Sequence, residues 1–373
     1  MASLGLGNGW ECLFANDIDE KKAKAYNDNL HSGEAANSPL EVDDVGNLKT
    51  HQLNGNVDLA WASFPCQDLS LAGGGAGLNG GRSGTFWPFW ELMQALNAEG
   101  RSPRLIVLEN VRGAITSHGG KDFAAIGDAL ADGGYAFGGI VIDASLFLPQ
   151  SRPRLFFVAV KAGALIPNGV VAQEPQSPWH TEALLRAQRL LSPASKDLWR
   201  WWTLPQPSSK RKGLSKLLEK NPNSVRWHTP EETQHILGLM SERNIAKVRE
   251  KMASRERAVG TVYRRTRPGP DGRRVQRAEV RFDDVSGCLR TPAGGSSRQT
   301  LLIVEGEQVR SRLLSTREAA RLMGLPKSYM LPERYNEAYH LVGDGVAVPV
   351  VRYLAAQLLE PLLAATTAAI AAE

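Results

Sequence analysis

The sequence predicts an α/β protein that has a doubly wound sheet in its first part and a second, smaller domain after it. Within residues 1–160, short apolar runs of strand length alternate with stretches of helical spacing. After residue 161, prolines recur up to Pro207 and tryptophans cluster at positions 179–202, which is typical of an irregular start to a new domain. A chain of 373 residues is long enough for both parts.

The first part divides into expected strands and helices. The run Arg104–Glu109 (RLIVLE) is the clearest strand, because its interior is wholly apolar, as burial on both faces of a parallel sheet requires. The other expected strands span 10–15, 57–64 and 155–160, and the expected helices span 20–29, 86–97 and 123–132.

The second part mixes helices with strands. Residues 230–254 have helical spacing, and two expected strands at 262–267 and 275–282 are joined by the turn sequence Pro-Gly-Pro-Asp-Gly. Ser315 and Glu318 have the spacing of a capping box, which predicts that a helix begins there and runs to residue 323. We expect the segment 348–363 to form an amphipathic helix that returns to the first domain.

The composition is that of a globular protein, with 42% hydrophobic and 22% charged residues. No apolar run approaches the roughly 20 residues that would span a bilayer, and the N-terminus does not resemble a secretory signal. The three cysteines are too scattered for a disulfide framework or a CxxC metal site. We therefore expect a cytoplasmic protein with no membrane partner and no bound metal.

Positive charge is concentrated in one segment. The net charge is +5, but residues 243–281 hold 13 Lys or Arg and 4 Asp or Glu, so this segment carries +9 and the rest of the chain −4. Such a distribution is expected of a surface that contacts a phosphate backbone. A solvated helix face would give a similar pattern.

A thiol and a carboxyl group stand at the ends of two expected strands. Cys66 follows Pro65 where the strand 57–64 ends, and Glu109 closes the next strand. Open α/β sheets bind ligands beyond the carboxyl ends of their strands, so we expect both side chains in one crevice. There they could act as a nucleophile and a proton donor. Taken alone, Cys66 would more often be a small buried apolar residue and Glu109 a solvated strand end.

Three short motifs resemble, in order and spacing, those of bacterial-type DNA (cytosine-5)-methyltransferases. They are Pro65-Cys66-Gln67, Glu109-Asn110-Val111 and Gln150-Ser151-Arg152-Pro153-Arg154. The resemblance implies a Rossmann-like methyltransferase fold with a separate target-recognition domain, S-adenosyl-L-methionine as cofactor and double-stranded DNA as partner. It also implies base flipping, DNA methylation within restriction-modification, and a monomeric enzyme.

The same resemblance suggests the role of each catalytic residue. Carbon 5 of cytosine is a weak nucleophile, so the Cys66 thiolate would add to carbon 6 while Glu109 binds nitrogen 3 and the exocyclic amine. Arg152 and Arg154 would hold the base carbonyl and the nearby backbone. The glycine-rich segment 70–84 would form a loop that closes over DNA.

The resemblance also assigns cofactor contacts. Asp17 would bind the ribose hydroxyls, Ile18 would lie against the adenine face, and Asp44 would accept from the adenine amino group. Asp344 stands where the family usually has asparagine, which removes a donor because a carboxylate only accepts. The remaining expected cofactor contacts are Val45, Pro65, Thr85 and Val346.

The chain departs from the family pattern at its start. The family begins with a strand and an FxGxGG loop that holds the methionine end of the cofactor, whereas Met1–Leu6 resembles the helix after those glycines. We expect this departure, typical of a truncated reading frame, to weaken cofactor binding and leave a gap in the sheet. The expected domains are an N-terminally truncated catalytic and cofactor domain (1–163), a target-recognition domain (164–312) and a return to the catalytic domain (313–373).

Other functions remain open at this point. A catalytically inactive DNA-binding protein without the cofactor glycine loop is the main alternative, and an RNA methyltransferase with the same chemistry is another. A nicotinamide-dependent oxidoreductase is disfavoured because the sequence has no Gly-rich dinucleotide loop. Within the recognition domain, phosphate contact is the commoner role for an arginine, and the possible guanine readers are Arg264, Arg265, Arg267, Arg290 and Arg298.

Overall fold

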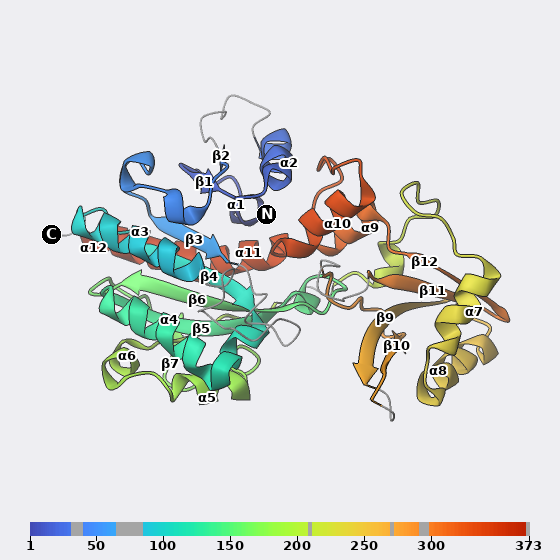
Figure 1. Cartoon of the computed structure of the whole chain (residues 1–373). Helices are drawn as coiled ribbons and strands as arrows, with labels where there is room; N and C mark the ends of the chain where they lie inside the picture. The colour runs from blue at the N-terminus through green and yellow to red at the C-terminus, as the bar shows by residue number, and fades with distance from the viewer. Residues whose placement is uncertain (31–39, 65–84, 208–210, 269–271, 291–297, 371–373) are drawn as a thin grey trace. The chain divides into compact units, whose positions relative to one another are not determined.

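The computed structural model describes residues 1–30, 40–64, 85–207, 211–268, 272–290 and 298–370, and Figure 1 shows their course. The chain divides into two units, and each is assembled from separate stretches of sequence. The larger unit comprises Ala2–Asp143, Pro153–Pro207 and Val350–Glu373. The smaller unit comprises Met1, Ala144–Arg152 and Ser208–Pro349.

The larger unit is built on a four-stranded sheet in the order β3-β4-β6-β5. Its strands are β3 (Leu59–Ser63), β4 (Leu105–Val111), β5 (Tyr135–Asp143) and β6 (Pro153–Lys161). Strands β3 and β4 are parallel, but β6 runs antiparallel to both β4 and β5. The sheet is therefore mixed, where the sequence predicted a parallel one, because β5 and β6 form an antiparallel pair.

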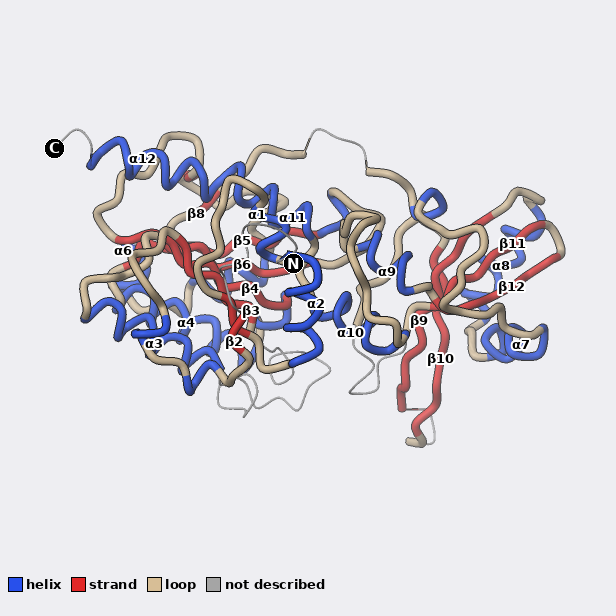
Figure 2. The backbone as a smooth tube through the Cα atoms, turned by 90° about the horizontal axis from the view of Figure 1, so that it is seen from above, coloured by secondary structure: helices blue, strands red, loops and turns tan. Residues whose placement is uncertain are grey.

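Helices cover both faces of this sheet, so the expected doubly wound α/β fold class is confirmed. Figure 2 shows α3 (Phe86–Ala98) and α4 (Lys121–Asp132) on one side of the sheet and α12 (Glu360–Ile370) on the other. One core joins both helices to the sheet, with Trp90 from α3, Phe123 from α4 and Phe157 from β6 all buried. Because both faces are covered, the interiors of β4, β5 and β6 are buried almost throughout.

A separate pair of parallel strands lies near the start of the chain. Strand β1 (Ala15–Asn16) pairs with β2 (Leu40–Glu41). Between them in the chain lies α2 (Glu20–Leu30), which confirms the helix that the sequence predicted there. The strand expected at 10–15 is thus limited to its last residue and the one after it. Among the residues that the structure describes, no strand joins this pair to β3, which is the edge of the four-stranded sheet and is only partly buried.

Residues 164–207 belong to the larger unit, although the sequence placed them in the recognition domain. Strand β8 (Trp201–Trp202) pairs with β7 (Val171–Ala172), and the Arg200 N–H donates to the carbonyl oxygen of Phe137 in β5. A Cβ atom on Gly138 would lie 1.9 Å from the Arg200 carbonyl oxygen, so only glycine permits this close approach. The segment is held by contacts with β5 that sequence composition does not reveal.

The smaller unit contains an antiparallel sheet in the order β10-β9-β11-β12. Its strands are β9 (Ala258–Pro268), β10 (Arg274–Arg281), β11 (Thr300–Glu305) and β12 (Gln308–Leu313). The helices α7 (Pro230–Gly238) and α8 (Glu242–Ala253) share a core with β9, β10 and β11. The stretch 230–254, which we expected to be helical, forms these two helices with a break between them. At the break, the Leu239 carbonyl oxygen accepts a hydrogen bond from the Ala278 N–H of β10.

The last helices pass from the smaller unit to the larger. Helices α9 (Thr316–Leu322) and α10 (Tyr335–Asp344) lie in the smaller unit, so the boundary expected at 312 differs from that of the unit. From Val350 onward α11 (Val348–Leu354) and α12 belong to the larger unit. Within the described residues, the helical stretch Tyr335–Thr366 is long and apolar enough to cross a membrane, but half of its most apolar window is buried in the protein.

Candidate active site

Glu109 near the end of β4 forms an ion pair with Arg154 at the start of β6. Arg154 Nε and Glu109 Oε1 are 3.0 Å apart, and the two side chains are 13% and 9% exposed. In the antiparallel register, Val111 stands opposite Arg154 and Glu109 opposite Phe156, so Glu109 and Arg154 are diagonal neighbours on one face of the sheet. The structure thus brings together two of the four expected catalytic residues.

Strand β3 ends next to Glu109 of β4. Ser63 pairs with Glu109 in the parallel register of β3 and β4. Asn110 Nδ2 donates to the carbonyl oxygen of Phe64 at 3.4 Å, while Asn110 Oδ1 accepts from the Val111 N–H at 2.8 Å. Pro65 and Cys66 come directly after Phe64 and lie outside the described residues, as does the glycine-rich segment 70–84.

Arg152 has a different environment from Arg154. It belongs to the smaller unit and is 1% exposed. Its guanidinium donates to the carbonyl oxygens of Leu289, Gly343 and Gly345 at 2.9, 2.8 and 2.7 Å, and to Cys288 Sγ at 3.2 Å. The guanidinium is therefore used to join two distant stretches of the smaller unit.

Gln150 performs a similar task two residues earlier. It is fully buried, its Nε2 donates to the Leu322 carbonyl oxygen at 2.6 Å, and its Oε1 accepts from the Leu289 N–H at 3.2 Å. Gln150 and Arg152 together hold both polar groups of the Leu289 backbone. Sequence reasoning found both residues but did not find these partners, because they lie more than a hundred positions away.

The expected ribose and adenine contacts lie at one end of the β1–β2 pair. Asp17 follows β1, and its Oδ1 accepts from the Asp19 N–H at 2.9 Å. Asp44 begins the short 3₁₀ helix Val45–Asn47, and its Oδ1 accepts from the Gly46 N–H at 2.9 Å. Asn16 Nδ2 bridges the two loops by donating to the carbonyl oxygens of Glu41 and Asp43 at 3.1 and 2.9 Å.

These residues fit an adenosine. Ile18, which follows Asp17 in the chain, has a large apolar side chain that is 68% exposed. The carboxylates of Asp17 and Asp44 accept hydrogen bonds only, which suits ribose hydroxyls and an adenine amino group, and the Ile18 side chain suits the face of a flat ring.

The other expected cofactor residues are spread over both units. Thr85 directly precedes α3, and Val45 packs against the core of the larger unit. Asp344 ends α10 and is exposed, whereas Val346 is 5% exposed, and both belong to the smaller unit. The structure gathers Asp17, Ile18, Asp44, Val45 and Thr85 in the larger unit.

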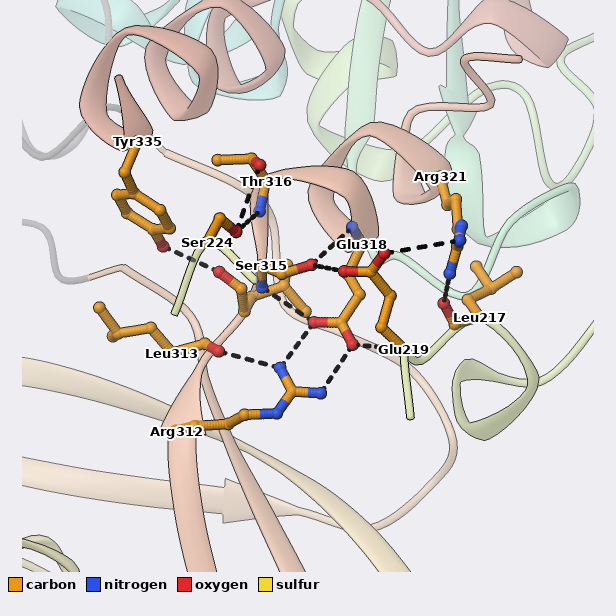
Figure 3. A network of polar contacts seen from close by, with 11 residues as sticks. Leu217, Glu219, Ser224, Arg312, Leu313, Ser315, Thr316, Glu318, Arg321 and Tyr335 are labelled. Carbon is orange, nitrogen blue, oxygen red and sulfur yellow. Dashed lines mark hydrogen bonds and ion pairs between the residues drawn. The ribbon is translucent and has the colours of Figure 1, made fainter. Parts of the chain in front are cut away.

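A buried ion pair in the smaller unit was not expected from the sequence. Arg312 of β12 and Glu318 of α9 have side chains that are each 1% exposed, and two hydrogen bonds of 2.7 Å join them (Figure 3). The Glu318 carboxylate also accepts from the N–H groups of Ser315 and Glu219, at 2.8 and 2.7 Å. Burial alone would raise the pKa of Glu318, but these donors outweigh it and hold the pKa below the ordinary 4.5.

This network fixes the first turn of α9. Ser315 caps the helix and Glu318 completes the capping box, as the sequence predicted. Ser315 Oγ also donates to Glu219 Oε2 at 2.6 Å, so the segment around Glu219 is tied to the same turn (Figure 3). The capping residues were visible in the sequence, but their partner Arg312 was not.

The basic segment contains a projecting hairpin. Strands β9 and β10 extend away from the helices of the smaller unit (Figure 2), and together they carry six arginines and one glutamate. Arg265 stands directly opposite Arg277 across the two strands. Like charges in this position repel each other, and a polyanion bound there would relieve the repulsion. The Arg267 side chain and residues 291–297 lie outside what the structure describes.

Comparison with protein families gives one match over almost the whole chain. The model of the family described as C-5 cytosine-specific DNA methylase matches residues 2–360. The Type II methyltransferase M.Bsp6I of Bacillus sp. (strain RFL6) is 24% identical over 360 residues, which are 95% of this chain and 93% of that protein. The Type II methyltransferase M.HhaI of Haemophilus parahaemolyticus is 22% identical over 355 residues, with 93% and 87% covered.

Solved structures resemble the chain in fold. A mutant of DNMT2 from Spodoptera frugiperda has a TM-score of 0.60 at 18% identity, and the match covers 97% of this chain and 95% of that one. The Dnmt2 methyltransferase of S. pombe has a TM-score of 0.53 at 19% identity, with 94% and 91% covered. At these identities the likeness establishes the fold alone.

Proposed function

We propose that Cys66, Glu109 and Arg154 carry the reaction of this chain, which belongs to the C-5 cytosine-specific DNA methylase family. The chain is accordingly a DNA cytosine-5 methyltransferase that uses S-adenosylmethionine. The observation that supports this assignment is the ion pair of Glu109 with Arg154, next to the strand that leads to Cys66. The family assignment favours this enzyme over the catalytically inactive DNA-binding protein.

The residues of the chain make carbon 5 of the flipped cytosine nucleophilic. The Cys66 thiolate adds to carbon 6, and Glu109 holds nitrogen 3 and the exocyclic amine, so the electron pair of the ring double bond becomes available at carbon 5. Bound S-adenosylmethionine supplies the methyl group as an electrophile. A water molecule then takes the proton from carbon 5, and the electron pair left on carbon 5 restores the double bond as the thiolate of Cys66 departs from carbon 6.

The two arginines have separate tasks in this proposal. Arg154 holds Glu109 in position, and in this proposal its guanidinium also donates to the base carbonyl. Arg152 was expected to contact the base or the nearby backbone, but its guanidinium donates to four acceptors of the protein. We therefore assign it a positioning role in the smaller unit.

The cofactor residues follow from the fit of the β1–β2 pair to an adenosine. Asp17 and Asp44 would accept from the ribose and the adenine amino group, with Ile18 on the ring face. Pro65, Thr85, Asp344 and Val346 complete the proposed cofactor set, and Val45 belongs to it through its place beside Asp44.

The substrate is DNA, and the proposed form is the duplex. The arginine-rich hairpin of the smaller unit supports this choice over RNA, because its extended strands suit the groove and phosphates of a double helix. We further propose a monomer that acts in the cytoplasm, within restriction-modification.

Incubation of the chain with tritiated S-adenosylmethionine and duplex DNA tests this function. The expected result is label in the DNA, located at carbon 5 of cytosine after hydrolysis to nucleosides. Binding to the same duplex, measured by fluorescence anisotropy, provides the comparison: binding without label would overturn the enzyme in favour of the inactive DNA-binding protein. Preferential labelling of tRNA in a mixture would overturn the choice of substrate.

A further inference from the structure

We propose that Arg290 reads a guanine of the target site and that Tyr263 positions it. This inference rests on the proposed function, because it names what the smaller unit contacts in the duplex. Arg290 precedes the segment 291–297, and Tyr263 lies in β9.

Two arginines from distant stretches converge on the Tyr263 ring. The Arg265 guanidinium lies 4.7 Å from the ring centroid and that of Arg290 lies 5.6 Å from it. Stacking on an aromatic ring restricts the plane of a guanidinium while leaving its N–H edge available. Tyr263 therefore restricts where the Arg290 guanidinium lies.

The backbone next to Arg290 is fixed from the other side. Leu289 is 1% exposed, its N–H donates to Gln150 Oε1, and its carbonyl oxygen accepts from Arg152 Nη1. Arg290 is thus anchored at its backbone by buried side chains and at its tip by an aromatic ring. Such a double anchor is what a residue needs in order to read a base edge with defined geometry.

Two other possible guanine readers have polar partners. Arg265 lies 3.6 Å from the carboxylate of Glu279, and Arg298 donates to Asn336. Arg290 is exposed, and across the described parts of the chain no carboxylate forms an ion pair with it. Its donors are therefore available to a ligand.

Guanine is the ligand that matches this arrangement best. Its N7 and O6 accept two parallel hydrogen bonds from one guanidinium in the major groove, which requires a fixed guanidinium plane. A phosphate makes no such demand, because it accepts from a mobile side chain in many directions. The stacking of Arg290 on Tyr263 thus favours the base over the backbone.

Selection of bound sequences from a random duplex pool by the full chain tests the proposal. The variants are Arg290→Gln, Arg290→Lys and Tyr263→Leu, and Arg249→Gln is the matched control, an exposed arginine paired with Glu242 on α8. We expect Arg290→Gln to lose the preference for one G·C pair by on the order of 10- to 100-fold, with the other positions kept. Arg290→Lys should lose it as well, because an ammonium lacks the planar fork.

Tyr263→Leu should weaken the same preference without shifting it to another position, and the control should select the wild-type sequence. The salt dependence of the duplex Kd should keep its wild-type slope in Arg290→Gln. A uniform loss of affinity with a slope reduced by about one would identify Arg290 as a phosphate contact and overturn the proposal. An unchanged selected sequence in Arg290→Gln would overturn it equally.

The outcome is separable from that of the methylation assay. Wild-type chain that selects a sequence but transfers no label would refute the proposed function, while the reading of guanine is still decided by the selected sequences. Thermal unfolding of each variant confirms that the exposed substitutions leave the fold intact.

Discussion

Ser63 stands directly opposite Glu109 in the parallel pairing of β3 with β4. Because parallel strands end at the same edge of a sheet, this register brings the end of β3 to the level of the Glu109 carboxyl group. The hydrogen bond from Asn110 to the Phe64 carbonyl oxygen fixes the same end of β3. The predictions for the active site rest on this register.

Glu109→Gln should lower kcat by about 10²- to 10⁴-fold and change the duplex Kd little. The amide has the shape of the carboxyl group but cannot exchange a proton with the ring nitrogen. Single-turnover transfer of tritiated methyl groups measures the effect, and Glu91→Gln, at an exposed position of α3, is the control. A rate close to wild type in Glu109→Gln would show that the carboxyl group has no part in the chemistry.

Duplex DNA with 5-fluorocytosine at the target position should form a stable covalent complex with the chain. With S-adenosylmethionine present, carbon 5 becomes methylated, and the adduct then persists because fluorine cannot leave carbon 5 as a proton does, so the thiolate cannot depart from carbon 6. Gel electrophoresis under denaturing conditions detects the complex. Cys66→Ser should abolish it, whereas Cys12→Ser and Cys288→Ser should keep it, and a complex that survives Cys66→Ser would assign the nucleophile elsewhere.

Arg152→Met should lower the free energy of unfolding by at least about 3 kcal/mol, because it leaves buried carbonyl groups without their charged donor. Urea unfolding measures the change. Arg226→Met is a suitable comparison, since Arg226 is exposed and its pair with Glu232 lies at the surface, where an ion pair contributes little to stability. If both variants lose equally little, the bonds of Arg152 contribute nothing to stability.

Glu318→Gln should cost about 3 to 5 kcal/mol, because it leaves the buried Arg312 without its carboxylate. A double-mutant cycle with Arg312→Met should reveal strong coupling, and the same cycle on the exposed pair of Arg226 with Glu232 should reveal little coupling. The lowered pKa of Glu318 adds a pH test. Its stabilisation is present above the ordinary pKa of 4.5 and is lost as the pH falls through the lower value. Equal coupling in both pairs would contradict the role of burial.

His180 should make the larger unit sensitive to mild acid. Burial lowers its pKa from 6.5 to about 4, so the folded chain favours the neutral ring. Its contribution is complete above pH 6.5 and is lost as the pH falls towards 4, because the unfolded chain takes up the proton first. Urea unfolding should be measured at about pH 7.5 and about pH 5, on either side of the ordinary histidine pKa. The free energy of unfolding should fall less between these two pH values in His180→Gln than in wild type. His51→Gln, at an exposed position, is the control, and parallel profiles for all three chains would refute the prediction.

The sequence predicted where β3 and β4 end and which reactive residues stand there, because short motifs lie at the ends of these strands. It did not predict β5, whose Gly138 and Gly139 weaken the strand signal, although Gly138 is required by the Arg200 carbonyl oxygen. The strand expected at 10–15 is two residues long in the structure. These differences come from contacts between distant segments, which local patterns cannot show.

The arginines of the third motif illustrate the same limit. Arg152 and Arg154 are two positions apart and were given one shared role, yet Arg154 pairs with Glu109 and Arg152 binds backbone carbonyls of the smaller unit. The difference depends on where the chain passes from one unit to the other, between Arg152 and Pro153. Nothing in the spacing of the motif marks that position.

The contribution of Ala144–Arg152 to the smaller unit has a bearing on engineering new target sites. A relative that received only Ser208–Pro349 of this chain would have to hold Leu289 and Gly343 with its own counterparts of Gln150 and Arg152. A working exchange therefore has to match two separate stretches of sequence, the shorter of which lies between two stretches of the larger unit.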